Sequence, residues 1–350
     1  MIKYLGSKRR LVGLIGDLYA LTPSNTAADV FAGTTRVGQE LKRRGAYVHS
    51  IDYTAYSDVF AKCYIETDLN NLDLAGLEKR MAALMALPPT EGYFVTEFCR
   101  EARFFTEENG RHINSMWDYL RSHTDDPLWP LLMTSLIEAA DRVDSTVGVQ
   151  MAYLKKWAAR ALLPINLRVP ELIPGKGQSH RLQLPDEAGK VPEVDFAYFD
   201  PPYNQHSYVG NYHIWETMAR GDTPETYGVA HKRTDIRNKD NGSLFNRKNQ
   251  IKDALRATVQ GIKAKHRLIS YSDDTWLSLA DLLEIAGDGA IALAVAQRRY
   301  IGSQIGIYNP SGEKVGKPGK EKNNELLVLS GPKKWIEAVT DSYADLIVKP

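Results

Sequence analysis

Short apolar runs alternate with a stretch of helical composition along the amino-terminal part of the chain. Residues 26–31 and 47–51 have the length and the apolar content of buried strands. Between them, residues 39–44 have helical composition and end at Gly45, a residue type that commonly stops a helix. We therefore expect a strand, a turn, a helix and a second strand, which is the start of an α/β fold with parallel strands.

The pattern changes from about residue 70 to residue 165, where apolar residues recur among charged ones at helical spacing. Pro88 and Pro127 divide this stretch into shorter pieces. We expect residues 70–165 to form a helical subdomain, inserted into an α/β domain that is made of residues 1–69 and 166–350.

Further strands are expected in the second half of the chain, at residues 195–199, 267–272, 290–299 and 325–330. The last two flank the polar loop 309–324, so they predict an antiparallel hairpin at the edge of a mostly parallel sheet. Residues 204–256 are expected to be mostly irregular.

Composition narrows the class of protein only slightly. The chain has 44 Lys and Arg against 43 Asp and Glu, so its formal charge of +1 neither indicates nor excludes nucleic-acid binding. Two cysteines, Cys63 and Cys99, are too few for a disulfide framework or a zinc site, and the eight histidines show no ligand spacing, so no metal is expected. No apolar run reaches the roughly 18 residues of a membrane span, and the amino terminus has no apolar signal core. We expect a cytoplasmic protein.

The tetrapeptide Asp200-Pro201-Pro202-Tyr203 directly follows the predicted strand 195–199. Neither proline can donate a backbone hydrogen bond, and each fixes its φ near about −65°, so the strand ends in a rigid corner. The carboxylate, the free carbonyl groups and the aromatic ring of this corner suit a flat heteroaromatic amine, with acceptors for an NH2 group and a ring to stack on. An ordinary turn is the alternative.

A second group of candidates surrounds the turn after the first strand. Gly33 and Gly38 allow a tight turn, and Asp52 ends the next strand about twenty residues later. This arrangement binds adenosine-containing cofactors, with the acid on the ribose hydroxyls. Asp29 lies inside a buried strand, where a carboxylate is costly unless it is paired or binds a ligand. The alternatives are an ordinary strand-to-helix turn and a helix-capping or surface acid.

The opening segment 3–8 reads Lys-Tyr-Leu-Gly-Ser-Lys, an aromatic residue, a small flexible pair and a cation. Lys8 is a candidate for the carboxylate of an amino-acid cofactor, with Tyr4 packed nearby; a frayed basic terminus is the alternative. Residues 231–256 contain eight Lys or Arg against three Asp, which favours contacts with phosphates. A solvated loop is the alternative for that segment.

The order of four features along the chain resembles that in the α-class amino-methyltransferases, the group of bacterial and phage N6-adenine DNA methylases. These features are the opening segment, the Phe31-Ala32-Gly33 turn, Asp52 and the Asp-Pro-Pro-Tyr corner. The resemblance extends to segments 103–109, 211–217 and 270–273, so that it covers roughly residues 1–330. It implies a three-layer Rossmann-like methyltransferase fold. The implied reaction transfers a methyl group from S-adenosyl-L-methionine to the N6 amine of an adenine flipped out of duplex DNA, as in restriction-modification systems. A cognate restriction endonuclease encoded nearby is a candidate partner.

The resemblance also implies roles for individual residues. The implied catalytic residues are Asp200, Pro201, Pro202 and Tyr203. The implied cofactor-binding residues are Tyr4, Ser7, Lys8, Asp29, Phe31, Gly33, Thr34, Asp52, Tyr53, Asp186 and Asp200. The candidate DNA-binding residues are Tyr208, Asn211, Tyr212, Lys232, Arg233, Arg237, Lys239, Arg247 and Lys248.

The resemblance is incomplete at the third strand, where the family usually has an acid at the edge of the cofactor adenine. Asp186 and Gln183 are the candidates there. Target recognition is expected in the helical insertion, where the possible readers are Arg103, Arg111, Asn114 and Arg121.

Two other functions stay open. One is methylation of another planar amine: cytosine N4, guanine N2 in ribosomal RNA, or protein glutamine. The other is a catalytically silent, DNA-binding descendant of a methylase. Asp200 favours adenine, since cytosine-N4 relatives usually have Ser at this position.

Overall fold

The computed structural model describes residues 1–6, 8–203, 205, 207–238, 243–298 and 322–349. Ser7 and Lys239, two of the predicted site residues, lie outside these ranges, as does most of the polar loop 309–324. Within them, the main sheet has eight strands in the order β10–β8–β9–β7–β4–β1–β2–β3. Their bounds are β1 (Thr26–Val30), β2 (Tyr47–Asp52), β3 (Gly177–Arg181), β4 (Val194–Phe199), β7 (Ala264–Ser272), β8 (Ile291–Arg298), β9 (Lys322–Ser330) and β10 (Ile347–Val348).

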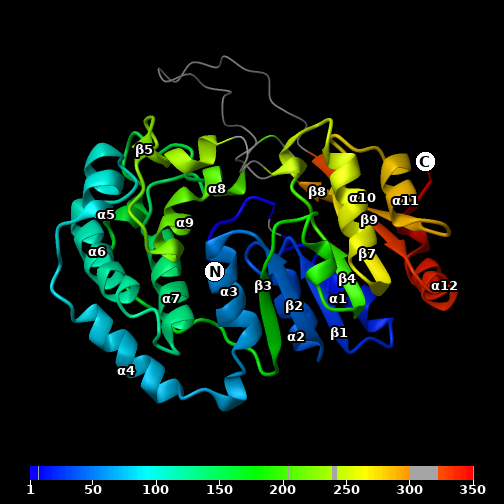
Figure 1. The fold of residues 1–350 in the computed structure, drawn as a ribbon, viewed down its shortest axis with the longest axis horizontal. Coiled ribbons are helices and arrows are strands. Elements are labelled where there is room, and N and C mark those ends of the chain that lie inside the picture. The colour runs from blue at the N-terminus through cyan, green and yellow to red at the C-terminus, as the bar shows by residue number, and fades with distance from the viewer. Residues whose placement is uncertain (7, 204, 206, 239–242, 299–321, 350) are drawn as a thin grey trace.

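The sheet is parallel over five of these strands and antiparallel at one edge (Figure 1). Strands β3, β2, β1, β4 and β7 run in the same direction, whereas β9 is antiparallel to both β7 and β8. The predicted α/β fold with a mostly parallel sheet is therefore confirmed, and so is its terminal antiparallel hairpin. A separate small hairpin pairs β5 (Thr226–Tyr227) with β6 (Lys232–Arg233).

Helices cover both faces of the sheet because successive strand residues point to opposite sides. Phe196 and Tyr198 of β4 pack in the same apolar cluster as α1, α2 and α12, whereas Ala197 and Phe199 pack with α10 and α11. The predicted three layers are thus present. The helices are α1 (Val12–Ala20), α2 (Arg36–Arg43), α3 (Ala55–Ala61), α4 (Leu74–Met85), α5 (Tyr93–Val95), α6 (Glu107–Arg121), α7 (Trp129–Arg142), α8 (Tyr208–Asn211), α9 (His213–Arg220), α10 (Ile251–Gly261), α11 (Leu279–Ala286) and α12 (Lys333–Ser342).

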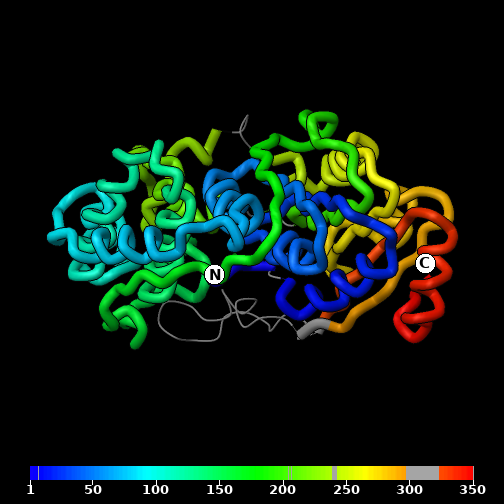
Figure 2. Tube along the Cα trace, turned by 90° about the horizontal axis from the view of Figure 1, so that it is seen from below, coloured from blue at the N-terminus to red at the C-terminus, as the bar shows by residue number. Residues whose placement is uncertain are grey.

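A helical body lies beside the β3 edge of the sheet, and the two parts give the molecule its elongated shape (Figure 2). Helices α4 to α7 contribute to one apolar cluster, in which Trp117 is buried. The same cluster takes in α3 and α9, so the chain returns to this body after β4. The predicted irregularity of residues 204–256 is wrong for α9 and α10. Helix α9 is only eight residues long, too short to show a clear period, and it is held by the burial of Ile214, Trp215 and Met218.

None of the described helices is long and apolar enough to cross a lipid bilayer.

Candidate active site

The strand order itself locates the site. The chain places β2 and β3 on one side of β1, and β4 and β7 on the other. Where the order reverses, the loops that leave the carboxyl ends of β1 and β4 diverge and open a crevice, which is where α/β sheets bind ligands. A cleft of about 630 Å³, open to solvent, lies at this point. Of the predicted residues, those that line it are Tyr4, Lys8, Asp29, Phe31, Gly33, Thr34, Asp52, Tyr53, Asp200, Pro202 and Tyr208.

The turn after β1 has a backbone conformation that few residues adopt. Phe31 has a φ of +66° and Gly33 a φ of +51°. A Cβ atom at Gly33 would lie 2.8 Å from the Tyr4 hydroxyl oxygen, so glycine is needed there both for its conformation and for space. The Phe31 ring packs edge-on against Phe245, with ring centroids 4.7 Å apart, which holds this unusual backbone in place.

Asp52, at the end of β2, fixes the position of this turn. Its Oδ2 accepts a hydrogen bond from the Gly33 amide at 3.0 Å, and its Oδ1 accepts from both the amide and the hydroxyl of Thr54 at 2.9 Å. Burial raises the pKa of the Asp52 carboxyl, and these donors oppose that rise. The carboxylate is therefore held in one orientation at the wall of the cleft.

Asp29 joins the first strand to helix α2. Its Oδ2 accepts a hydrogen bond from the Gly38 amide at 2.7 Å, and a Cβ atom at Gly38 would lie 2.9 Å from the same oxygen. Burial raises the pKa of Asp29 to about 8, so the carboxyl group is costly to ionise without a nearby positive charge.

Aromatic rings anchor the opening segment to the helical body. The Tyr4 ring stacks on Tyr212 at 4.7 Å and on Tyr208 at 5.3 Å between centroids. Its hydroxyl lies 3.2 Å from the hydroxyl of Tyr56 on α3. The Leu5 amide also donates to the Tyr212 hydroxyl at 2.6 Å. Tyr212, a predicted DNA-binding residue, is thus buried and packs against the opening segment.

Lys8 is the central group of a charge cluster that includes Asp200 and Glu325. Lys8 Nζ lies 2.9 Å from Asp200 Oδ1 and 2.8 Å from Glu325 Oε1, and the Ser270 hydroxyl donates to the same Glu325 oxygen at 2.5 Å. Burial raises the pKa of Asp200 to about 6, although Lys8 opposes the rise. The two carboxylates outweigh the effect of burial on Lys8, whose pKa is raised well above its usual value. Lys8 is therefore charged and engaged with acids in this structure, and no ligand carboxylate is needed to pair it.

The rest of the corner is rigid and largely enclosed. The Asp200 amide donates to the Val30 carbonyl at 3.2 Å, which extends the pairing of β4 with β1 by one residue. Pro201 and Pro202 are buried. The Tyr203 ring packs edge-on against Tyr271 at 5.6 Å and lies 5.7 Å from Lys8 Nζ, so it contacts the charge cluster without lining the cleft.

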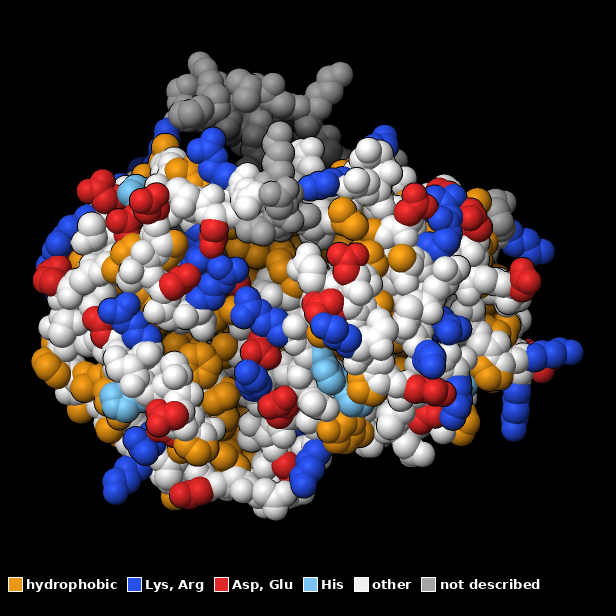
Figure 3. Space-filling view, in the orientation of Figure 1, with side chains coloured by type: hydrophobic (Ala, Val, Ile, Leu, Met, Phe, Trp, Pro, Cys, Tyr) orange, Lys and Arg blue, Asp and Glu red, His pale blue; other side chains and the backbone are white. Residues whose placement is uncertain are grey.

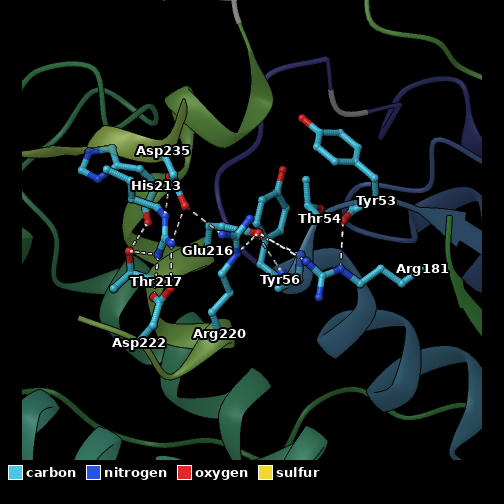
Figure 4. A network of polar contacts seen from close by, with 12 residues as sticks. Tyr53, Thr54, Tyr56, Arg181, His213, Glu216, Thr217, Arg220, Asp222 and Asp235 are labelled. Atoms are coloured by element: carbon cyan, nitrogen blue, oxygen red, sulfur yellow. Dashed lines mark hydrogen bonds and ion pairs between the residues drawn. The ribbon is translucent and has the colours of Figure 1, made fainter. Parts of the chain in front are cut away.

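A second network links the helical body to the wall of the cleft (Figure 4). The Glu216 carboxylate of α9 is fully buried and accepts hydrogen bonds from the amides of Ala55 at 2.9 Å and Tyr56 at 3.3 Å, at the start of α3. Arg220 Nε donates to its other oxygen at 2.8 Å. Arg181 Nε donates to the carbonyl of Tyr53, a residue of the cleft wall, at 3.0 Å.

The predicted DNA-binding residues lie in different environments. Arg233 is buried, and Asp222 and Asp235 bind its guanidinium. Lys232 is half-buried, and burial lowers its pKa. Among the predicted cations, Arg237 and Lys248 are exposed.

Two further predicted positions, Asn211 and Arg247, are less exposed than Arg237 and Lys248. Asn211 is buried, whereas Arg247 is half-buried and donates to Gln250 at 3.2 Å. The face shown in Figure 3 carries acidic and basic side chains interspersed, as the near-neutral composition implies.

The candidate readers in the helical insertion are engaged with neighbours. Arg111 pairs with Glu91 and Glu107, and the Asn114 side chain is buried. The guanidiniums of Arg103 and Arg121 lie over the rings of Trp157 and Trp117, respectively. Asp186 and Gln183, the candidates for the cofactor adenine edge, are exposed and do not line the cleft. Among the described residues, no group of His, Cys, Asp or Glu has the arrangement of a metal site.

Sequence reasoning missed three residues of this site. Glu325 and Glu216 are buried acids, and the argument that singled out Asp29 applies equally to them. Arg36, the first residue of α2, lines the cleft, and its Nε is buried without a hydrogen-bond partner in the described part of the chain. The only feature of the sequence that indicates Arg36 is its position shortly after the glycine turn.

Comparison with known proteins identifies similar chains. Residues 4–269 match the family described as D12 class N6 adenine-specific DNA methyltransferase. The chain is 27% identical to the type II methyltransferase M.NlaIII of Neisseria lactamica, over 81% of this chain and 87% of that protein. It is 26% identical to the type II methyltransferase M.CviAII of Paramecium bursaria Chlorella virus 1, over 87% and 94%. It is 28% identical to the modification methylase LlaI of Lactococcus lactis subsp. lactis, over 95% of this chain but 57% of that longer protein.

Proposed function

Because the chain belongs to the D12 class of N6 adenine-specific DNA methyltransferases, we propose that its cleft binds S-adenosyl-L-methionine and that its Asp200 corner receives the adenine amine. The family's reaction, sequence-specific methylation of adenine N6 in DNA, is the reaction of this enzyme. The observation that carries the site assignment is the half-buried Asp200 carboxylate, held by Lys8 at the wall of a cleft at the sheet's switch point.

The lining of the cleft suits this cofactor. Asp52 is held where a carboxylate can accept hydrogen bonds from a diol, and the glycine turn brings the backbone close to a ligand. Asp29 is buried and Asp52 and Asp200 are half-buried, and the pKa values of all three acids are raised, which favours a ligand that carries positive charge. Arg36 offers an unpartnered guanidinium nitrogen for a carboxylate. A sulfonium amino acid joined to adenosine has all of these groups.

The residues of the Asp200 corner make the adenine amine a better nucleophile. An exocyclic adenine amine is a poor nucleophile because its lone pair delocalises into the ring. Hydrogen bonds to the Asp200 carboxylate and to the Pro201 carbonyl favour a more pyramidal nitrogen, whose lone pair then points into the cleft. S-adenosyl-L-methionine supplies the activated methyl group. The nitrogen loses one proton as it gains the methyl group, and the Asp200 carboxylate is the proposed acceptor of that proton.

The target base must leave the duplex to reach this corner. Stacking of a flipped base on an aromatic ring contributes roughly 1–3 kcal/mol, and Tyr203 and Tyr208 are the rings proposed for it. We propose that the helical insertion, residues 70–165, recognises the target sequence. Arg237 and Lys248, the exposed cations, are proposed to contact phosphates. A cognate restriction endonuclease remains the proposed partner, and the cytoplasm, where cellular DNA is modified, the proposed location.

The test is incubation of the protein with S-adenosyl-L-methionine and unmethylated plasmid DNA, followed by digestion to nucleosides and mass spectrometry. We expect N6-methyldeoxyadenosine, and its loss in Asp200→Ala by at least about a hundredfold, as when a preorganised polar partner is removed. Asp52→Ala should weaken cofactor binding and leave DNA affinity unchanged. Near-normal turnover of Asp200→Ala would refute the site assignment.

A further inference from the structure

Glu325 is a buried acid on β9 with no direct contact to the cleft. Glu325 is 5% exposed, and the buried apolar residues Leu326 to Leu329 follow it along the strand. Its partners are Lys8, which is 317 positions away in the chain, and Ser270 on the neighbouring strand β7. Burying a carboxylate is costly, and apolar side chains of similar volume usually pack such a site at least as stably. Packing alone therefore does not account for Glu325.

Lys8 is shared between two acids, one directly after β4 and the other on β9. Its Nζ is 2.9 Å from Asp200 Oδ1 and 2.8 Å from Glu325 Oε1, so the two distances are nearly equal. With one acid, the buried lysine and Asp200 would form a neutral ion pair, in which the positive charge of Lys8 offsets the whole negative charge of the carboxylate. With two acids, the three groups carry a net negative charge, and Asp200 keeps part of it for another donor.

We propose that Glu325 is a positioning residue for catalysis: it holds Lys8 in place and shares its charge, so that Asp200 is fixed in orientation and still accepts a hydrogen bond from the target amine. This inference rests on the proposed role of Asp200. The other titratable groups that interact with the cluster are Tyr198 and Tyr203, which lie near Lys8, and Asp29 and Tyr208, which lie near Asp200. Among the described residues, Asp200 and Glu325 are the acids paired with Lys8 Nζ, so these two carboxylates determine its position.

The experiment compares Glu325→Gln and Glu325→Met with the wild type, with kcat, KM for DNA and the dissociation constant of S-adenosylhomocysteine measured for each. The amide oxygen of Gln still accepts a hydrogen bond from Lys8, whereas Met accepts none. We expect kcat to fall in the order wild type, Gln, Met, by at least about tenfold for Met, as when a preorganised electrostatic contact is weakened. KM and cofactor affinity should stay unchanged. Asp195→Asn is the matched control, because Asp195 pairs with Lys265 at the opposite end of β4 from Asp200.

A double-mutant cycle with Lys8→Met separates positioning from simple destabilisation. If Glu325 acts through Lys8, its replacement by Met in the Lys8→Met background removes an unpaired buried acid and lowers kcat no further. An equal fold-loss in both backgrounds would overturn the proposal, as would a rise in KM at unchanged kcat. If Asp200→Ala abolishes turnover while both Glu325 variants behave as wild type, this inference fails and the active-site assignment stands. If Asp200→Ala retains turnover, the assignment itself fails.

Discussion

The Glu216 carboxylate accepts a hydrogen bond from the Ala55 amide at 2.9 Å, although the two residues lie 161 positions apart. Thr54, the residue before α3, makes no side-chain cap, so the carboxylate from α9 satisfies amides that the start of α3 would otherwise leave unpaired. Thr54 in turn donates to Asp52. A helix of the helical body therefore supports the loop that holds the proposed ribose acid.

This relationship predicts the effect of Glu216→Ala. Loss of the cap and of a buried ion-pair partner should lower the free energy of unfolding by about 2 kcal/mol or more, measured by denaturant titration. Because the Asp52 loop loses its support, cofactor binding by calorimetry should also weaken, with Glu216→Gln intermediate. Asp235→Asn is the control, since Asp235 also pairs with Arg220 but does not reach α3. Normal cofactor affinity in folded Glu216→Ala would contradict this coupling.

The position of Arg36 in the cleft predicts that its replacement affects the affinity of two ligands differently. S-adenosylhomocysteine has an amino-acid carboxylate, whereas 5′-methylthioadenosine lacks it. A hydrogen bond to a charged group contributes about 1.5–3 kcal/mol, so Arg36→Gln should weaken the first ligand roughly tenfold to a hundredfold and leave the second unchanged. Arg43→Gln on the same helix is the control, because the Arg43 side chain is 46% exposed. Equal weakening of both ligands would assign Arg36 to another part of the cofactor or to folding.

The raised pKa of Asp200 predicts an acid limb in the pH profile. The ionised carboxylate is the form that accepts the hydrogen bonds of the amine, and the pKa is about 6, so kcat should fall as pH drops through about 6 and level off above it. Lys8 and Glu325 face the same carboxyl group and set this value together with burial. The residual activity of Asp200→Asn should lack the limb, because an amide does not titrate in this range. Asp29→Asn should retain it; loss of the limb in Asp29→Asn would move the titration from Asp200 to Asp29.

The sequence was sufficient for those parts of the site that depend on local chemistry. The Asp200 corner is rigid because of its two prolines, and the glycine turn needs Gly33, so both could be predicted from neighbouring residues alone. The strands of the sheet and its terminal hairpin followed from apolar runs and from the polar loop between the last two strands. The resemblance to a known family then supplied the roles.

The partners of these residues could not be predicted, since they come from distant segments. Nothing near Lys8 in the sequence indicates that it pairs with Asp200 and Glu325. Local charge counting was similarly incomplete: it treated Arg233 as a surface cation, whereas two aspartates bind it in the interior. Composition records how many cations a segment has, but exposure and pairing determine which of them are available to DNA.

The basic segment gives the last prediction, which concerns the salt dependence of DNA binding. Each phosphate contact contributes about 0.9 to the slope of log K against log salt, so the double variant Arg237→Gln, Lys248→Gln should reduce the slope by about 2. The matched control is Lys252→Gln with Arg256→Gln. These two cations pair with acids on α10 and α11, so their removal changes the net charge equally without removing an exposed cation. A slope that falls equally in both double variants would mean that DNA responds to net charge alone, and that neither Arg237 nor Lys248 contacts a phosphate.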